Sequence, residues 1–328
     1  MRITITSRIG IYRCHNKRND KDNDKDNDND NDKDNDKDND NDIEEAMGLN
    51  YSKLLANKFA VVTCGDTGVG AAIVRLFAEH GATVAFGARD ESIATSVIRL
   101  INGISPESFY YPCDLSVAES VESFCAEINR QRPLVHALIN NPWFAWSKPF
   151  EDSDEEDDAL IFQVYQRSIM QTLRAFWPAM LDAGGCAVVN ISSESVVKPV
   201  QGALMQTMAN GAIGGMTRVP AVEGGAREVR VNEIYAPSGL DNAPAFTLCS
   251  EARLDRTARS ESSGNEQNDT VRSESSGIGR NDVACATNVQ RDIACVANAA
   301  LFLSSDMSSY ISGISLSVSG GSRRMRFA

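Results

Sequence analysis

The sequence is poor in the residues from which metal sites and membrane spans are built. Its 328 residues include only three histidines, and none of its eight cysteines stands in a CxxC pair. We therefore expect neither a zinc site nor another metal site. No uninterrupted apolar stretch approaches the roughly 20 residues that a membrane-spanning helix needs, so no membrane partner is expected. Cysteines scattered through a long chain are typical of a reduced, cytoplasmic protein.

Positive charge is also scarce. The formal net charge is −13, and Lys and Arg form no stripe along the part of the chain that carries apolar patterning. Proteins that bind nucleic acid rely on such a stripe to neutralise phosphates. The composition therefore excludes nucleic acid as a main partner.

The first 46 residues differ from the rest in composition. Residues 19–42 alternate Asp with Asn or Lys and contain no apolar side chain. This segment has nothing to bury and its carboxylates repel one another, which favours disorder. Calcium could use such carboxylates, but an EF-hand loop needs a Gly turn and a terminal Glu that the tract lacks. We expect a disordered extension over 1–46 and one folded domain over 47–328.

Short apolar runs alternate with helical periods from residue 58 onward. Runs typical of buried parallel strands cover residues 59–63, 83–88, 109–113, 134–139, 187–191, 229–234 and 314–318. Helical patterns lie between them at 69–80, 92–102, 117–130, 159–181, 203–223 and 291–303. This alternation predicts an α/β fold, a single domain with a doubly wound parallel sheet of about seven strands.

Two short duplications interrupt the alternation. Residues 259–269 (RSESSGNEQND) and 272–282 (RSESSGIGRND) are near-copies, and residues 282–288 and 292–298 form a second pair. Two copies are too few for a solenoid. Because Ser, Glu, Asn and Gly dominate residues 250–282, we expect a mobile, duplicated surface loop there.

A glycine-rich segment separates the first predicted strand from the first predicted helix. It reads Thr63-Cys64-Gly65-Asp66-Thr67-Gly68-Val69-Gly70. A strand, a glycine-rich turn and a helix in this order are the setting of a dinucleotide-binding fingerprint. Glycines let the backbone approach a pyrophosphate, and the N-terminus of the helix offers free N–H groups to it.

Over residues 57–321 the chain resembles the short-chain dehydrogenase/reductase family, which has a Rossmann fold. The turn is similar to the family's TGxxxGxG, with Cys64 at the first Gly. Further resemblances follow in order: CDL at 113–115, NNPW at 140–143, NISS at 190–193, RVN at 230–232 and ISLSVSGG at 314–321. The resemblance implies an oxidoreductase that moves a hydride between a nicotinamide dinucleotide and a small carbonyl or alcohol substrate. It also implies a homo-oligomer.

The resemblance assigns cofactor contacts to a set of turn and strand-end residues: Thr63, Gly65, Gly68, Gly70, Arg89, Asp114 and Asn140. Among these, Arg89 replaces the acidic residue that would hold a free ribose hydroxyl pair. A guanidinium can pair with a 2′-phosphate, so we expect NADP(H) over NAD(H). The alternative is that Arg89 is a solvated loop charge.

The family's catalytic pattern is broken in this sequence. Ser193 matches the Ser that polarises the substrate oxygen, but the family's acid/base Tyr and its Lys align with Gln206 and Asn210, and its Asn aligns with Tyr165. An amide does not transfer a proton near neutral pH, and Asn210 brings no charge. One hypothesis is an oxidoreductase in which Tyr165 or Tyr235 substitutes. The others are a pseudoenzyme that binds a nucleotide or a partner subunit, and a drifting gene product without selected activity.

Two further segments carry open expectations. Trp143 stands where the family has a small residue close to the cofactor, so its indole either crowds the ribose or joins an aromatic cluster with Phe144 and Trp146. Residues 151–158 contain seven carboxylates, and we expect a solvated loop there rather than a metal site.

Overall fold

The computed structural model describes residues 52–144, 147–238, 240 and 280–320. All of them belong to one compact unit, residues 49–328. The expected extension over 1–46 and residues 250–279 of the expected loop lie outside the described residues, as does Trp146.

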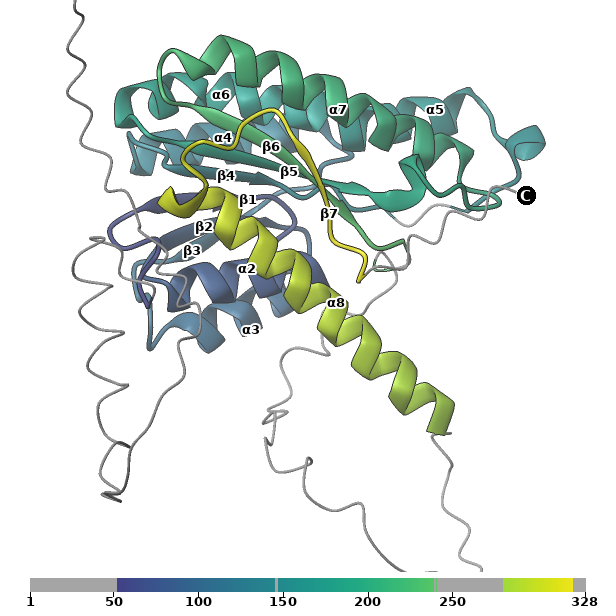
Figure 1. Ribbon diagram of the computed structural model, residues 1–328, viewed down its shortest axis with the longest axis horizontal. Coiled ribbons are helices and arrows are strands. Elements are labelled where there is room, and N and C mark those ends of the chain that lie inside the picture. Colours follow the sequence, from purple (N-terminus) through teal and green to yellow (C-terminus); the bar gives the residue numbers. More distant parts are fainter. Residues whose placement is uncertain (1–51, 145–146, 239, 241–279, 321–328) are drawn as a thin grey trace, which may run out of the picture. The chain divides into compact units, whose positions relative to one another are not determined.

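A single parallel sheet forms the centre of this unit (Figure 1). Its order is β3-β2-β1-β4-β5-β6-β7, and every neighbouring pair is parallel. The strands are β1 (Phe59–Val62), β2 (Thr83–Ala88), β3 (Phe109–Pro112), β4 (Ala137–Asn140), β5 (Ala187–Ser193), β6 (Arg230–Ala236) and β7 (Ser315–Ser317). The predicted doubly wound α/β fold is confirmed.

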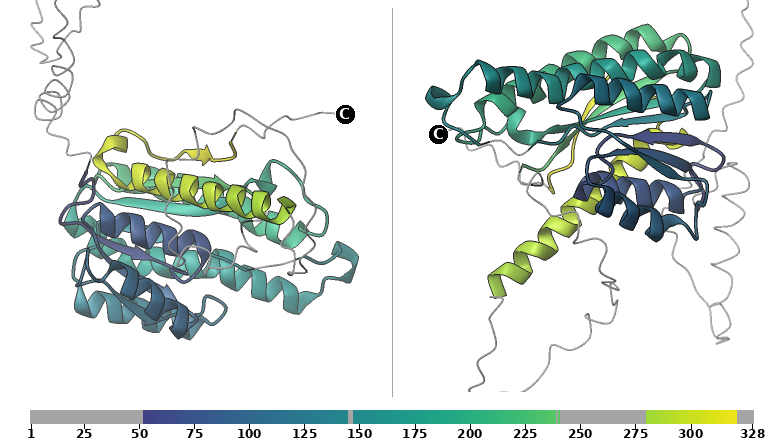
Figure 2. Two further views of the ribbon diagram at one scale, coloured as in Figure 1. Left: turned by 90° about the horizontal axis from the view of Figure 1, so that it is seen from below. Right: turned by 180° about the vertical axis from the view of Figure 1, so that it is seen from behind.

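Helices cover both faces of the sheet, as Figures 1 and 2 show. One face carries α2 (Gly68–Glu79), α3 (Glu91–Ile101) and α8 (Arg280–Ser304). The other face carries α4 (Ala118–Gln131), α6 (Ser168–Ala183) and α7 (Leu204–Gly225). Two hydrophobic layers result, one on each face of the sheet.

The alternation of side chains along β1 explains why both layers form. Ala60 and Val62 pack into the layer beneath α2 and α8, whereas Phe59 and Val61 pack into the layer beneath α4 and α6. All four are buried. A strand covered on both faces can be apolar at every position, which is why β1 reads as an unbroken hydrophobic run.

The predicted helix over 159–181 begins earlier and is not α-helical throughout. It starts as α5 (Glu155–Ile161), passes through a π-helical segment (Phe162–Arg167, η2) and continues as α6. Asp154 begins α5 with a capping box, because its carboxylate accepts from the backbone of Asp157 while the Asp157 carboxylate accepts from the backbone of Asp154. The prediction of a loop over 151–158 is therefore wrong for residues 155–158, which belong to α5.

Helix α8 also begins earlier than predicted. It starts at Arg280, so the expected loop does not extend to residue 282, and both copies of the second duplication lie within one helix. The copy at 292–298 buries Ile293, Val296 and Ala297 against the sheet layer shared with α2. An apolar spacing of three and four residues gives the helix this buried stripe.

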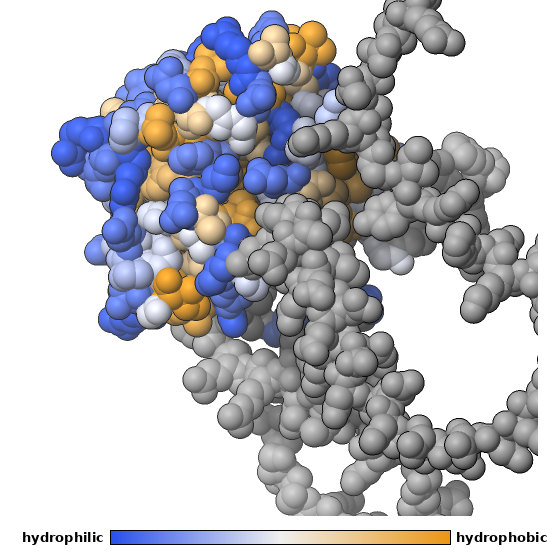
Figure 3. Space-filling view, turned by 60° about the vertical axis from the view of Figure 1, so that its left-hand side comes forward, coloured by the Kyte–Doolittle hydropathy of each residue, from blue (hydrophilic) through white to orange (hydrophobic). Residues whose placement is uncertain are grey.

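The surface of the described residues shows no membrane-spanning element. None of the helices formed by the described residues is long and apolar enough to cross a bilayer. The face seen in Figure 3 is a mosaic in which hydrophilic residues separate small hydrophobic patches.

Arg230, at the start of β6, ties the end of α8 to the sheet. It is 9% exposed, and its guanidinium donates to the carbonyls of Leu303 and Ser305 and to the hydroxyl of Ser308 at 2.8–3.1 Å. The last carbonyls of a helix have no partner within the helix, so this cation satisfies them. Burial lowers the pKa of Arg230, but three acceptors compensate the buried charge.

Replacing Arg230 by Met should reduce the free energy of unfolding by roughly 3 kcal/mol, because the carbonyls at the end of α8 lose a charged donor while remaining buried. Urea denaturation measures this loss. Arg227→Met, at an exposed position nearby, is the matched control and should change stability by less than about 0.5 kcal/mol. Equal stability of the two variants would contradict the role assigned to Arg230.

Candidate active site

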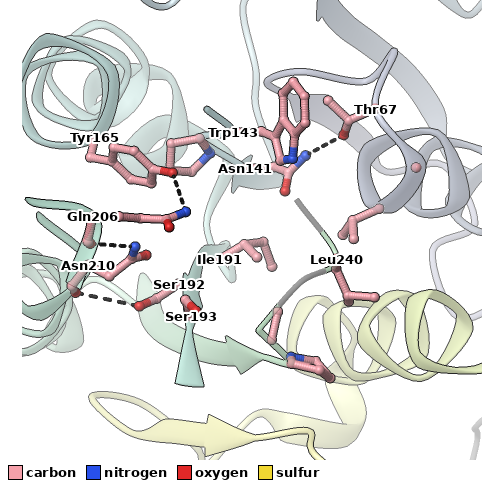
Figure 4. Close-up of a pocket in the computed structure, with 15 residues that line it drawn as sticks. Thr67, Asn141, Trp143, Tyr165, Ile191, Ser192, Ser193, Gln206, Asn210 and Leu240 are labelled. Atoms are coloured by element: carbon pink, nitrogen blue, oxygen red, sulfur yellow. Dashed lines mark hydrogen bonds between the residues drawn. The ribbon is translucent and has the colours of Figure 1, made fainter. Parts of the chain in front are cut away.

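A pocket opens at the carboxyl ends of the strands, beside the point where the strand order reverses between β1 and β4. Ligands of doubly wound sheets bind at such a point. The pocket's walls come from the turn after β1, the loop after β4, the ends of β5 and β6, η2 and α7. Its lining residues are Thr67, Gly68, Val69, Asn141, Pro142, Trp143, Tyr165, Ile191, Ser192, Ser193, Gln206, Asn210, Ala236, Pro237 and Leu240 (Figure 4).

The glycine-rich turn has the form of a phosphate cradle. Thr67 caps α2, because its hydroxyl accepts from the backbone of Gly70 and donates to the carbonyl of Cys64. A Cβ at Gly65 would overlap Phe86, and one at Gly70 would overlap the carbonyl of Cys64, so both positions require glycine. Gly68 begins the helix and lines the pocket, with its N–H at the positive end of the helix dipole.

Cys64 adopts a backbone conformation that favours glycine. Its φ is +47°, in the left-handed region where a side chain costs about 1 kcal/mol or more. The Trp143 backbone N–H donates to its sulfur, and the Asn141 side chain donates to its carbonyl at 3.3 Å. Two departures from the family pattern, at Cys64 and Trp143, therefore touch each other.

Asp66 lies in the turn after β1, and its carboxylate reaches the residues that follow β2. Its Oδ2 accepts from the backbone N–H groups of Arg89 and Asp90 at 2.9 and 3.0 Å. The Arg89 side chain is exposed, and a carboxylate holds its backbone. Nearby, Asp114 uses its own carboxylate to accept from the backbone and hydroxyl of Ser116.

Asn140, an expected cofactor contact, points away from the pocket. It is buried, donates to the side chain of Asn190 at 2.9 Å and accepts from Thr172 at 2.7 Å. The next residue, Asn141, lines the pocket instead, and its backbone N–H donates to the hydroxyl of Thr63. Sequence reasoning missed Asn141, although its place in the NNPW segment was the available signal.

The four residues at the catalytic positions, three of them altered, do come together in the pocket. The hydroxyl of Tyr165 accepts from the side chain of Gln206 at 3.2 Å and donates to the carbonyl of Phe144 at 3.2 Å. The side chain of Asn210 donates to the backbone carbonyl of Gln206 at 2.8 Å. Ser193 accepts from the backbone of Ser195 at 3.2 Å, which leaves its proton for another acceptor.

The arrangement lacks the charge that a proton relay needs. Tyr165, on the wall formed by η2, is the one phenol among the described residues that line the pocket, and none of these residues is a Lys or Arg. Tyr235, the other candidate acid, lies on β6 and is not among the lining residues. Ser193 can orient a substrate oxygen, but a serine hydroxyl does not protonate an alkoxide at neutral pH.

The start of α2 suits one part of a nicotinamide dinucleotide, whereas the pocket beside it is narrow for the other part. The N–H groups at the start of α2 suit a pyrophosphate. The pocket itself is narrow, because the space among its lining residues is about 30 Å³, room for about two water molecules. Trp143 is one of the residues that line this space. Within the described ranges, no three His, Cys, Asp or Glu side chains gather as metal ligands would.

Comparison with known proteins identifies the family. Residues 58–245 match the sequence profile described as short chain dehydrogenase. A 2,5-dichloro-2,5-cyclohexadiene-1,4-diol dehydrogenase of Sphingobium indicum is 28% identical over 267 residues, covering 81% of this chain and 96% of that protein. A 3-oxoacyl-[acyl-carrier-protein] reductase of Chlamydia muridarum is 29% identical over 275 residues, covering 82% and 99%.

Solved structures agree with the sequence relatives. A short chain oxidoreductase of Pseudomonas aeruginosa, described as containing an atypical catalytic centre, has a TM-score of 0.64 at 27% identity and covers 82% of this chain and 98% of its own. The architecture and the cradle thus define an α/β oxidoreductase fold of the dinucleotide-binding type. The chain belongs to the short chain dehydrogenase family.

Burial raises the pKa of the Cys64 thiol to about 12, with a smaller contribution from Asp66. Thiolate is the form that reacts with iodoacetamide, so Cys64 should be alkylated at pH 8 at least tenfold more slowly than the exposed Cys295. Its rate should keep rising up to pH 11, whereas that of a free cysteine peptide levels off above about pH 9. Peptide mass spectrometry measures both rates, and Cys64→Ser identifies the peptide. Rapid labelling of Cys64 at pH 8 would contradict this assignment.

Proposed function

We propose that this chain binds a nicotinamide dinucleotide at its glycine-rich turn and is a pseudoenzyme for the family's hydride transfer between carbonyl and alcohol. The observation that carries the proposal is the bond from the Asn210 side chain to the carbonyl of Gln206. Asn210 stands at the position where the family has a Lys, which would lower the pKa of a Tyr four residues earlier on the helix. Both proton-transfer groups are thus replaced by amides: that of Asn210 donates to the backbone carbonyl of residue 206, and that of Gln206 donates to the Tyr165 hydroxyl.

The chain's own residues retain binding functions under this proposal. The N–H groups at the start of α2 would hold the pyrophosphate, and Arg89 would pair with an adenosine phosphate. A bound nicotinamide would supply the hydride. Ser193 would orient a small carbonyl or alcohol. The described residues that line the pocket do not include a Tyr with a neighbouring cation, the pair that would move the proton.

A second candidate function has one observation in its favour. Tyr165 places a phenol in the pocket, and the similar Pseudomonas aeruginosa oxidoreductase carries the description of an atypical catalytic centre. Under this alternative, Tyr165 donates the proton and the chain is an active oxidoreductase. Turnover in the unmodified protein that Tyr165→Phe abolishes would support it and would overturn the pseudoenzyme proposal.

The cofactor preference proposed is NADP(H) over NAD(H), with Arg89 as its source. Arg89→Ala should erase the preference by removing a charge-assisted contact worth roughly 1.5–3 kcal/mol. Asp66→Asn should enlarge it, because an amide keeps the bonds from the backbone of residues 89 and 90 without repelling a phosphate. Calorimetric titration with both nucleotides measures the ratio. Arg99→Ala, an exposed Arg on α3, is the control, and equal affinities in the unmodified chain would contradict the preference.

Restoring the missing pair tests the pseudoenzyme proposal directly. Gln206→Tyr together with Asn210→Lys should raise NADPH-dependent carbonyl reduction at least tenfold above the sum of the single variants. A Tyr without the Lys keeps a pKa near about 10, so each change alone should do little. Reduction of a panel of small ketones, followed by NADPH absorbance, is the measurement.

The matched control is Met208→Tyr with Asn102→Lys, which adds the same groups at exposed positions. This control should leave activity at the blank level. Robust turnover by the unmodified chain would contradict the proposal. A double variant that binds cofactor without any turnover would show that the geometry of the pocket, and not only the proton donor, has been lost.

A further inference from the structure

One corner of the molecule, where α5 meets the start of α7, exposes four large apolar side chains. Phe150 is 67% exposed, Phe162 57%, Val200 47% and Leu204 51%. Single apolar residues are common on protein surfaces, but a group of them gathered at one place marks a surface that another molecule covers. We call these four side chains the corner surface.

A backbone hydrogen bond joins the two loops that carry three of these side chains. The N–H of Lys148 donates to the carbonyl of Gly202 at 2.9 Å. Phe150 follows Lys148 by two residues, and Val200 and Leu204 lie two residues before and after Gly202. The three side chains therefore start from backbone that is held together at one point.

Two side-chain hydrogen bonds add the helix that carries Phe162 to this corner. The Lys148 ammonium donates to the carboxylate of Asp157 on α5 at 2.7 Å. The Gln206 side chain, in the first turn of α7, donates to Tyr165 at 3.2 Å, and Tyr165 lies three residues after Phe162 in η2. Both α5 and η2 accordingly pack against α7, as Figure 1 shows for α5.

The same corner is strongly acidic. Residues 147–162 and 198–204 contain seven carboxylates and two lysines, so their formal charge is −5. Lys148 pairs with Asp154 and Asp157. The remaining five carboxylates are exposed and form no ion pair with a described residue: Glu151, Asp152, Glu155, Glu156 and Asp158. An apolar surface is thus surrounded by unneutralised negative charge.

We propose that the corner surface docks a basic amphipathic helix of a partner protein. Asp158 lies four residues before Phe162 and therefore beside it on the same face of the helix. A partner helix with Leu on one face and Lys or Arg at its edges covers such apolar side chains and pairs with the carboxylates around them. The inference goes beyond dinucleotide binding, because none of the four side chains lines the pocket.

Charge argues against a second copy of this chain as the occupant. Two copies related by a two-fold axis meet through the same patch on each, so the acidic corner of one would face the acidic corner of the other. Carboxylates that face each other repel, whereas a basic helix neutralises them.

Three fluorescein-labelled peptides test the apolar and the charged requirement separately: LKKLLKLLKKLLKL, AKKAAKAAKKAAKA and LEELLELLEELLEL. Fluorescence anisotropy with the full chain at about 150 mM NaCl measures their affinities. The Leu/Lys peptide should bind at least tenfold more tightly than either of the others. The Ala/Lys peptide has the same charge without the large apolar face, so it reports attraction to the acidic tract at residues 19–42 and to other carboxylates.

Neutralising two carboxylates of the corner tests the charge. Glu155→Gln with Asp158→Asn should weaken binding of the Leu/Lys peptide at least threefold. The matched control is Asp182→Asn with Glu223→Gln, which removes two exposed charges near the C-terminal ends of α6 and α7. This control should change the affinity by less than twofold.

Removing two apolar side chains tests the corner surface itself. Phe162→Ser with Leu204→Ser should weaken binding of the Leu/Lys peptide at least tenfold and leave the Ala/Lys peptide unchanged. The matched control is Val222→Ser with Tyr310→Ser, at positions that are 82% and 103% exposed and outside the corner. Circular dichroism and the thermal midpoint check that every variant is folded.

Each outcome decides for or against the proposed docking surface. Equal binding of the Leu/Lys and Ala/Lys peptides, or unchanged affinity in both corner variants, would overturn it. Sedimentation of the free chain tests the other occupant: a dimer that Phe162→Ser with Leu204→Ser converts to a monomer would assign the corner surface to a second copy and also overturn the proposal. Peptide binding that needs both the carboxylates and the apolar side chains, with the oligomeric state unchanged, supports it.

Discussion

A series of buried hydrogen bonds links α6 and α7 to the central strands on the face of the sheet that these two helices cover. Thr172 of α6 donates to Asn140 of β4, Asn140 donates to Asn190 of β5, and Asn190 donates to Thr217 of α7. All four side chains are at most 1% exposed, so breaking any link would leave an unsatisfied polar group in a low-dielectric core. The register between the central strands and both helices is fixed by this requirement.

The pocket inherits its geometry from that register. Asn210 lies seven residues before Thr217 on α7, about two turns away, so both belong to the buried face of the helix. Tyr165 reaches the same space from the other side because the π-helical segment before α6 adds an extra residue to one turn. The tyrosine and the amides therefore meet at the strand ends, where all of them line the pocket.

Hydrophobic periodicity was enough to predict the seven strands and the layers, because a two-sided parallel sheet leaves an unmistakable apolar run at each strand. It could not predict where α5 begins, because the acidic segment reads as a loop until Asp154 and Asp157 cap each other. The order of the motifs along the chain was enough to predict that the altered catalytic residues share one pocket. They could not show that Asn140 belongs to the core and Asn141 to the pocket, because a one-residue difference in side-chain direction is set by tertiary contacts.

The left-handed backbone at Cys64 has a consequence for how this turn tolerates substitution. The bond to the Cys64 sulfur comes from the backbone N–H of residue 143, which every residue except proline carries. The contact therefore survives replacement of the Trp143 indole but is lost when Cys64 becomes glycine. A glycine at 64 relieves the left-handed backbone and at the same time removes the acceptor of that N–H. The two effects oppose each other in the free energy of folding, so the substitution should change stability less than either effect would alone.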